Sequence, residues 1–255
     1  MKIDQRKYDQ LMVKIYPDNP SLGYAAAQLA VEFLNRALRS RGSANLVLAT
    51  GNSMLTFLSA LSQIHVLDWS QVSIFHMDEY LGMSSDHPAS FRRFLREKIV
   101  NQVAPAVFYG IDGEANNPEA ECRRYSQLLQ DHPVDLCCLG IGENGHLAFN
   151  DPPFADFEDP KWVKIVALDE RSRLQQVGEG HFENLSSVPT HAITLTIPAL
   201  LSATNVIGVV PELRKAEAVY NALTGPISEK CPASILRRSE RVYLFLDSDS
   251  ASRLP

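Results

Sequence analysis

Features that define several specialised protein classes are absent from this chain of 255 residues. Its four cysteines, Cys122, Cys137, Cys138 and Cys231, form no CxxC pair, which argues against a zinc knuckle. Cys137 and Cys138 are adjacent in an apolar run, where free thiols behave as small buried hydrophobes. We therefore expect buried thiols and not a redox pair.

The sequence also has no run of 18 apolar residues and no signal-like apolar segment near its N-terminus. We expect a cytoplasmic protein with no membrane partner. The net charge is −6 and no stretch is rich in lysine and arginine, so no nucleic acid is expected as a partner. A small anionic ligand would have to be held by local positive groups.

What the sequence does contain is an ordinary globular composition, with 45% hydrophobic and 21% charged residues. Short β-branched apolar runs alternate with amphipathic runs, a pattern typical of parallel strands covered by helices. We predict one α/β domain over residues 1–255, with a doubly wound, mostly parallel, modified Rossmann-like sheet and helices on both faces. Strands are expected at residues 46–49, 72–76, 134–139, 163–167, 205–210 and 242–246, and helices at 21–41, 54–61, 90–100, 118–130 and 213–223.

Residues 151–189 form the least regular stretch, with Pro152, Pro153 and Pro160 and an acidic run at 156–159. A long segment of mixed character either covers a binding site as a lid or is an ordinary surface excursion. Composition alone favours neither interpretation.

Two polar segments that follow predicted strands are suited to binding an anion. Thr50-Gly51-Asn52-Ser53 stands between a strand and a helix, where Gly51 permits a tight turn and backbone N–H groups face a ligand. Ser53 as a simple helix N-cap is the plainer interpretation. Lys215 follows another strand and offers a cation, although a solvated lysine on a helix is equally ordinary.

Met77-Asp78-Glu79-Tyr80 places two carboxylates directly after the predicted strand at 72–76. A general base is well placed at the carboxyl end of a strand, and a second carboxylate raises the pKa of the first. In the plainer interpretation one of the two caps the following turn. The acids and histidines of this region match no standard metal signature, so no metal is predicted; they are His76, Asp78, Glu79, Asp86 and His87.

The segment Gly142-Glu143-Asn144-Gly145-His146 follows the predicted strand at 134–139. Its glycine spacing is not that of a dinucleotide-binding loop, so no NAD or other cofactor is expected. His146 lies between Asn144 and Asp151, two possible orienting partners. A histidine with an acid partner is suited to proton transfer, whereas a lone loop histidine is more often structural.

Together these segments resemble the glucosamine-6-phosphate deaminase (isomerase) family, within a larger group that includes the 6-phosphogluconolactonases. The resemblance covers about residues 11–250. The lactonases are similar around the glycines and histidine of residues 142–146. They usually lack the signatures that match Met77-Asp78-Glu79-Tyr80 and Ala148-Phe149-Asn150, so the deaminase branch is favoured. The matching segments are residues 50–53, 77–80, 86–91, 142–150, 189–194, 215–216 and 232–234.

The resemblance implies conversion of glucosamine 6-phosphate and water into fructose 6-phosphate and ammonia, without metal or cofactor. It implies that Asp78 moves a proton between C2 and C1, and that His146, oriented by Asn144 and Asp151, opens the sugar ring. It further implies contacts to the substrate or its phosphate from Thr50, Gly51, Asn52, Ser53, Glu79, Gly145, Arg173 and Lys215. The alternatives are a sugar-phosphate lactone hydrolase and a non-catalytic sugar-phosphate-binding regulator.

Several positions depart from the family pattern. Asn144 stands where many members carry Asp, and Asp151 where most carry Glu, so Asp151 must reach His146 with one methylene fewer. The family's phosphate-binding arginine belongs to a lid stretch whose counterpart is residues 170–182, with Arg173 as the candidate. Residues 152–156 lack the basic residues that form the allosteric pocket of hexameric members. We expect a monomer or small homo-oligomer whose partner is a small-molecule sugar phosphate.

This last departure gives a kinetic prediction. The rate should depend hyperbolically on the concentration of glucosamine 6-phosphate, because residues 152–156 lack the basic side chains that bind a second sugar phosphate in the hexameric members. Steady-state rates with and without N-acetylglucosamine 6-phosphate test this. A sigmoidal curve that this ligand relaxes would contradict the prediction.

Overall fold

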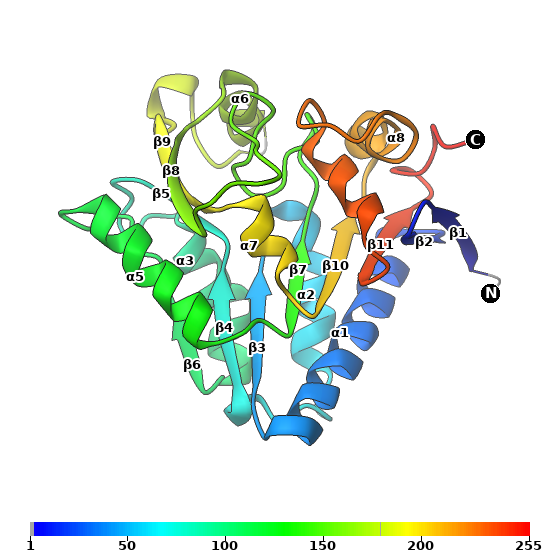
Figure 1. Ribbon diagram of the computed structural model, residues 1–255, viewed down its shortest axis with the longest axis horizontal. Coiled ribbons are helices and arrows are strands. Elements are labelled where there is room, and N and C mark those ends of the chain that lie inside the picture. Colours follow the sequence, from blue (N-terminus) through cyan, green and yellow to red (C-terminus); the bar gives the residue numbers. More distant parts are fainter. Residues whose placement is uncertain (1–2, 179) are drawn as a thin grey trace.

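An eight-stranded sheet crosses the computed structural model, which describes residues 3–178 and 180–255 (Figure 1). Its order is β1-β2-β11-β10-β7-β3-β4-β6, and every neighbouring pair is parallel except β1 and β2. The strands are β1 (Asp4–Tyr8), β2 (Leu11–Tyr16), β3 (Ala44–Leu48), β4 (Val72–His76), β6 (Val107–Tyr109), β7 (Leu136–Leu139), β10 (Asn205–Val210) and β11 (Val242–Asp247).

Helices cover both faces of this sheet, so the predicted doubly wound α/β fold is confirmed (Figure 1). One face carries α1 (Asn19–Arg41), α2 (Leu55–Gln63) and α3 (Phe91–Leu95), which continues through a π-helical turn (Arg96–Val100) into α4 (Asn101–Val103). The other carries α5 (Pro118–Asp131) and α7 (Ile197–Leu201). Two more helices lie towards the carboxyl ends of the strands: α6 (Glu170–Gly178) and α8 (Ala216–Thr224).

The first helix shows how the sequence fixes such an element. Asp18 accepts a hydrogen bond from the Ser21 amide at the start of α1, and Gly42 ends the helix with a φ of 76°. Gly23 lies against the backbone of Phe57, so a side chain at this position would separate α1 from α2. Burial of small and aliphatic residues along one stripe then holds α1 on the sheet.

The centre of the core is the strand β7, whose four residues are all buried. Cys137 and Cys138 are 0% exposed although their side chains leave the strand on opposite faces, because helices cover both faces. Burial raises the pKa of the Cys137 thiol to about 12. Both thiols are thus structural, as predicted.

A second sheet corrects one prediction. The strand expected at 163–167 exists as β8 (Val163–Ala167), but it does not join the central sheet. It pairs antiparallel with β9 (His191–Leu195), which pairs antiparallel with β5 (Asp78–Tyr80). The physical reason is polarity: Lys164 interrupts the apolar run and its ammonium binds Asp159, so β8 is only partly buried.

The stretch from 151 to 189 is also more regular than its composition suggests, since it contains β8, α6 and a 3-10 turn at Leu185–Ser187. In Figure 1 α6 lies beyond the carboxyl ends of the central strands. Neither N-terminal strand was predicted: β1 is polar and exposed at the sheet edge, whereas β2 is apolar and partly buried and was missed. Within the described ranges, no helix is long and apolar enough to cross a membrane.

Candidate active site

The candidate site lies where the winding of the sheet reverses. From β3 the chain proceeds to β4 and β6, whereas β7, β10 and β11 lie on the other side of β3. The connections after β3 and β7 therefore leave the sheet in opposite directions and open a crevice at the carboxyl ends, where ligands of such folds bind. A pocket of about 610 Å³, including its part open to solvent, occupies this crevice.

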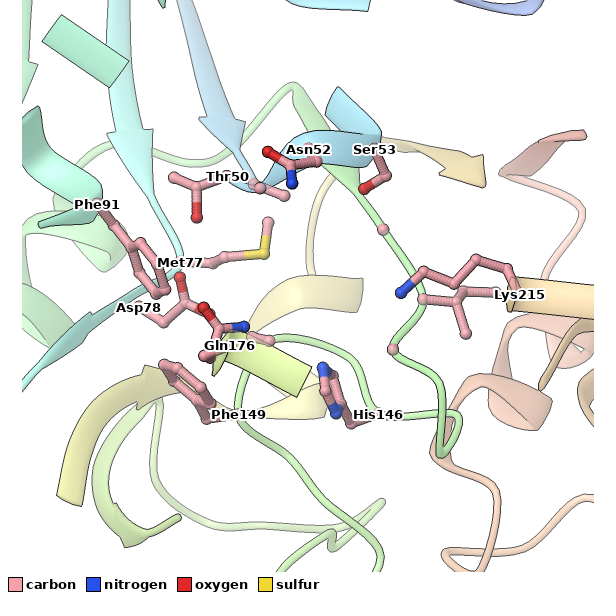
Figure 2. Close-up of a pocket in the computed structure, with 16 residues that line it drawn as sticks. Thr50, Asn52, Ser53, Met77, Asp78, Phe91, His146, Phe149, Gln176 and Lys215 are labelled. Carbon is pink, nitrogen blue, oxygen red and sulfur yellow. The ribbon is translucent and has the colours of Figure 1, made fainter. Parts of the chain in front are cut away.

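Segments far apart in the sequence line this pocket (Figure 2). They follow β3, β4, β7 and β10, as expected for functional residues of a parallel sheet. The lining residues are Ala49, Thr50, Gly51, Asn52, Ser53, Met77, Asp78, Phe91, Gly140, Ile141, Gly142, His146, Ala148, Phe149, Gln176 and Lys215.

The loop after β3 lines one side of the pocket with residues 50–53. Gly51 has a φ of 95°, which other residues rarely adopt, and a 3-10 turn at Asn52–Met54 leads into α2. Gly51 occupies the N-cap of this turn, so Ser53 is not the helix cap of the plainer interpretation. Its hydroxyl instead faces the pocket beside Thr50, where both can bind an anion together with the helix N-terminus.

Lys215 lies across the pocket from this loop (Figure 2). It ends the 3-10 turn Leu213–Lys215 after β10, and only 3% of it is exposed. The strained backbone of Glu212, with a φ of 83°, starts this turn, and its amide donates to both carboxylate oxygens of Asp247. Asp247 thus holds the connection that presents the buried cation to the pocket.

Asp78, the first residue of β5, pairs with Thr194 of β9 and reaches the pocket between Met77 and Phe91 (Figure 2). It is 7% exposed. Burial, and then the charge of Glu79, raise the pKa of this carboxyl to about 8. A carboxyl in this environment is suited to accept and return a proton near neutral pH.

Glu79 does not line the pocket, contrary to its expected role as a substrate contact. Its side chain is fully buried and accepts hydrogen bonds from the amides of Phe91 and Arg92 and from the hydroxyl of Ser90. It therefore caps the start of α3, as the plainer interpretation of one of the two acids held. Its negative charge nevertheless acts on Asp78 from the next position in the strand.

His146 projects into the pocket from the loop after β7 (Figure 2). Its Nδ1 lies 2.9 Å from Oδ1 of Asp151, so the shorter carboxylate does reach the imidazole. Asn144 links the two residues, since its side-chain oxygen accepts from the His146 amide and its Nδ2 donates to Asp151 at 2.8 Å. A Cβ at position 142 would collide with the ring, so Gly142 allows this orientation.

Asp151 is fully buried. Burial alone would raise its pKa, but hydrogen bonds from His146, Asn144 and Ser172 lower the pKa below the ordinary value. An ionised Asp151 can only accept hydrogen bonds, so Nδ1 of His146 donates to it and Nε2 is the ring nitrogen left for the pocket. The arrangement fixes the orientation of the His146 ring.

Two further expected substrate contacts lie elsewhere. Gly145 does not line the pocket; it has a φ of 86°, and a Cβ there would lie 2.8 Å from Sγ of Cys231. Arg173 donates through Nη2 to the backbone carbonyls of Leu185 and Val188, and it too is absent from the pocket lining. Gly145 shapes the loop, and Arg173 holds the segment after α6.

No functional role was predicted for several of the pocket residues. Phe91 and Phe149 form apolar walls near Asp78, and Gln176 of α6 extends its amide into the pocket (Figure 2). Ser172, one helical turn before Gln176, contacts Asp151. Because Ser172 and Gln176 are four residues apart, they lie on one face of α6. The function of that face can be recognised only once the position of α6 over the crevice is known.

Within the described part of the chain, no three His, Cys, Asp or Glu side chains come together as metal ligands. His76, considered as a ligand, lies below the pocket, where its Nε2 accepts from the Ile111 amide at 2.8 Å. Burial lowers the pKa of His76 to about 3. It is a neutral hydrogen-bonding residue of the core.

Comparisons with known proteins agree with this fold and identify the family. The profile of the family described as glucosamine-6-phosphate isomerases/6-phosphogluconolactonase matches residues 17–244. A glucosamine-6-phosphate deaminase of Bacillus cytotoxicus is 36% identical over 89% of this chain and 84% of its own length, and one of Listeria monocytogenes is 33% identical over 90% and 96%.

Solved structures give the same result for the fold. A monomeric glucosamine-6-phosphate deaminase superposes with a TM-score of 0.86 at 31% identity, covering 94% of this chain and 98% of that one. A 6-phosphogluconolactonase from Shewanella baltica superposes with a TM-score of 0.76 at 22% identity, covering 92% and 97%, and shares the fold.

The buried carboxyl of Asp78 predicts a pH-dependent stability. The unfolded chain releases this proton near pH 4, whereas the folded chain keeps it up to about pH 8. The stabilising contribution is thus fully present below pH 4 and is lost as the pH rises through 8. At pH 8 the free energy of unfolding of Asp78→Asn should exceed that of the wild type by on the order of a few kcal/mol. At pH 4 the two proteins should unfold at similar urea concentrations.

Urea titrations from pH 4 to pH 9 measure the difference, with the exposed Asp86→Asn as a control that should follow the wild type. Parallel stability curves for Asp78→Asn and wild type would contradict the raised pKa.

Proposed function

The chain belongs to the glucosamine-6-phosphate isomerase/6-phosphogluconolactonase family, and we propose that it is an enzyme that converts glucosamine 6-phosphate and water into fructose 6-phosphate and ammonia. The observation that carries the proposal is the pairing, across one pocket, of a buried carboxyl at Asp78 with the oriented base His146. Isomerisation of an aminoaldose requires these two proton-transfer groups and an anion site beside them.

Binding begins at the phosphate. Lys215 supplies the buried cation, while the hydroxyls of Thr50 and Ser53 and the amides at the start of the Asn52–Met54 turn supply hydrogen bonds. These groups stand on the side of the pocket formed by β3 and β10. The phosphate at one end of the sugar then directs C1 and C2 towards Asp78 and His146.

Ring opening is assigned to His146. Its Nε2 takes the proton from the anomeric hydroxyl and delivers it to the ring oxygen as the C1–O bond of the ring breaks. Asp151 stabilises the imidazolium during this transfer, since its ionised oxygen lies 2.9 Å from Nδ1. The product is the open-chain aldehyde, whose carbonyl acidifies the C2–H bond.

Asp78 then carries the proton between the two carbons. Its carboxylate removes the proton from C2 while the C1 oxygen gains a proton, which gives an enolamine. Asp78 then returns its proton to C1 and the amino nitrogen gives up one proton, equal to the one that the C1 oxygen gained, which leaves an imine at C2. Water adds to C2, the C–N bond breaks, ammonia leaves and the ketone forms. Because water is consumed, the reaction is formally hydrolytic. The apolar surroundings of Asp78, including Phe91 and Phe149, keep the base weakly solvated and hence strong enough for this step.

Assembly and location follow as parts of the proposal. The solved deaminase that this chain matches over 98% of that protein's length is described as monomeric. We propose that this chain is a monomer too. The four cysteines are free, three of them buried, which suits a reducing compartment such as the cytoplasm.

The test is a product assay. Incubation with glucosamine 6-phosphate should release ammonia and fructose 6-phosphate in equal amounts, and Asp78→Asn should lose at least about a thousandfold in kcat because no other carboxyl is found among the described residues that line the pocket. The exposed Asp86→Asn serves as the matched control and should keep wild-type rates. Hydrolysis of 6-phosphogluconolactone without ammonia release would overturn the proposal in favour of a lactonase, and calorimetric binding without either product in favour of a regulator.

A glycine substitution tests the role of His146 without altering a proton-transfer group. Gly142→Ala places a methyl group against the imidazole and should lower kcat roughly a hundredfold through misorientation of the ring. Binding of inorganic phosphate should be retained, since Lys215 and Ser53 are untouched. Gly178→Ala, where a Cβ meets nothing within 4 Å, is the control. An unchanged kcat in a folded Gly142→Ala variant would refute the assigned geometry.

A further inference from the structure

Ser172 is a buried hydroxyl on an otherwise largely exposed helix. It is 4% exposed, whereas Leu174 on the same helix is 51% exposed. Ser172 and Gln176 are four residues apart and therefore lie on one face of α6. Gln176 lines the pocket and Ser172 contacts Asp151, so this face of α6 is directed at the site (Figure 2).

The contacts of Ser172 converge on one oxygen atom. Its hydroxyl donates to Oδ1 of Asp151 at 2.5 Å and lies 3.2 Å from Nδ1 of His146. The same Oδ1 accepts from Asn144 Nδ2 and from His146 Nδ1. The other oxygen of Asp151 is buried and has no hydrogen-bond partner among the described residues. All polar contacts of this carboxylate therefore act on the atom that orients the histidine.

Ser172 differs from the other two partners in its origin. Asn144 and His146 belong to the same loop as Asp151, whereas Ser172 comes from α6, 21 residues further along the chain. Its hydroxyl stays close to Asp151 only while α6 is docked over the crevice. Removal of Ser172 would leave the Asp151 carboxylate with fewer donors and the imidazole with less restraint at Nδ1.

We propose that Ser172 is a positioning residue for ring opening, which holds the Asp151 carboxylate and the His146 ring in register when α6 covers the pocket. The proposal rests on the proposed function, because ring opening is the step assigned to His146. It predicts that the chemistry of His146 depends on a hydroxyl outside the glycine-rich loop, and that substrate binding itself does not.

The experiment isolates ring opening by use of the full chain carrying Asp78→Asn, in which proton transfer at C2 is blocked. Enzyme-catalysed exchange between the two anomers of glucosamine 6-phosphate is then followed by NMR exchange spectroscopy. Addition of Ser172→Ala should slow this exchange roughly tenfold. It should also move the acid limb of the rate to higher pH, because the pair His146–Asp151 loses a donor that favours the ionised carboxylate.

Three comparisons make the result decisive. Ser172→Thr keeps the hydroxyl and should restore most of the exchange rate. Ser202→Ala, which removes a hydroxyl that donates to the Ala199 carbonyl away from the site, should leave the rate unchanged. The Kd of an open-chain amino-alditol phosphate should be similar with and without Ser172→Ala. If Ser172→Ala does not fold, Ser172→Cys, with its weak donor, is measured by the same two readouts.

An exchange rate and acid limb unaffected by Ser172→Ala would overturn the proposal, and so would a folded Ser172→Thr variant as slow as Ser172→Ala. Failure of the proposed function looks different: the wild type would release no ammonia and the Asp78→Asn enzyme would catalyse no anomer exchange. In that case the proposed role of Ser172 is refuted together with the proposed function. An active wild type whose anomer exchange does not change with Ser172→Ala refutes only the role of Ser172.

Discussion

The crevice between β3 and β7 is the constraint on which the site depends. Parallel strands direct all their carboxyl ends to one edge, and the reversal of winding at these two strands leaves that edge uncovered. The loop after β3 and the glycine-rich loop after β7 thereby line the same pocket. Lys215 and Asp78 enter the pocket from the segments that follow the flanking strands β10 and β4. Four segments that are far apart in the sequence therefore meet because each follows a strand of the same sheet.

The small antiparallel sheet supplies what the central sheet cannot. A carboxylate directly after a parallel strand would face the solvent of the crevice, but pairing of β5 with β9 keeps Asp78 7% exposed. Glu79 lies on the opposite face of the same strand, where its side chain accepts the hydrogen bonds that cap α3. Alternation along the strand thus gives the two acids different roles. Asp78 lies in an apolar wall of the pocket with a raised pKa, and Glu79 anchors that wall.

Much of this was predictable from the sequence, because it depends on local chemistry. Glycines after apolar runs marked both loops, and the placement of Asp78, His146 and Lys215 after strands correctly brought them to one edge. Side-chain direction was less accessible. Glu79 and Arg173 carry the right charges in the right segments, yet their partners, the amides of α3 and the carbonyls of Leu185 and Val188, are fixed by tertiary packing. Ser172 and Gln176 gave no signal, since a polar helix face has meaning only against the surface it covers.

The replacement expected to weaken the site most, the shorter carboxylate of Asp151, is accommodated by the backbone. Ala148 adopts a φ of 51°, which tightens the turn between His146 and Asp151. Asn150 fixes this turn by donating to the carbonyls of Leu147 and Leu195, the latter in β9, and the Phe149 amide donates to Thr194 beside Asp78. The loop is thus held against the small antiparallel sheet by these hydrogen bonds, and in this position the Asp151 carboxylate reaches Nδ1 of His146. The same sheet therefore buries Asp78 and fixes the turn that carries the carboxylate bonded to His146, the two groups to which the proposed function assigns the proton transfers.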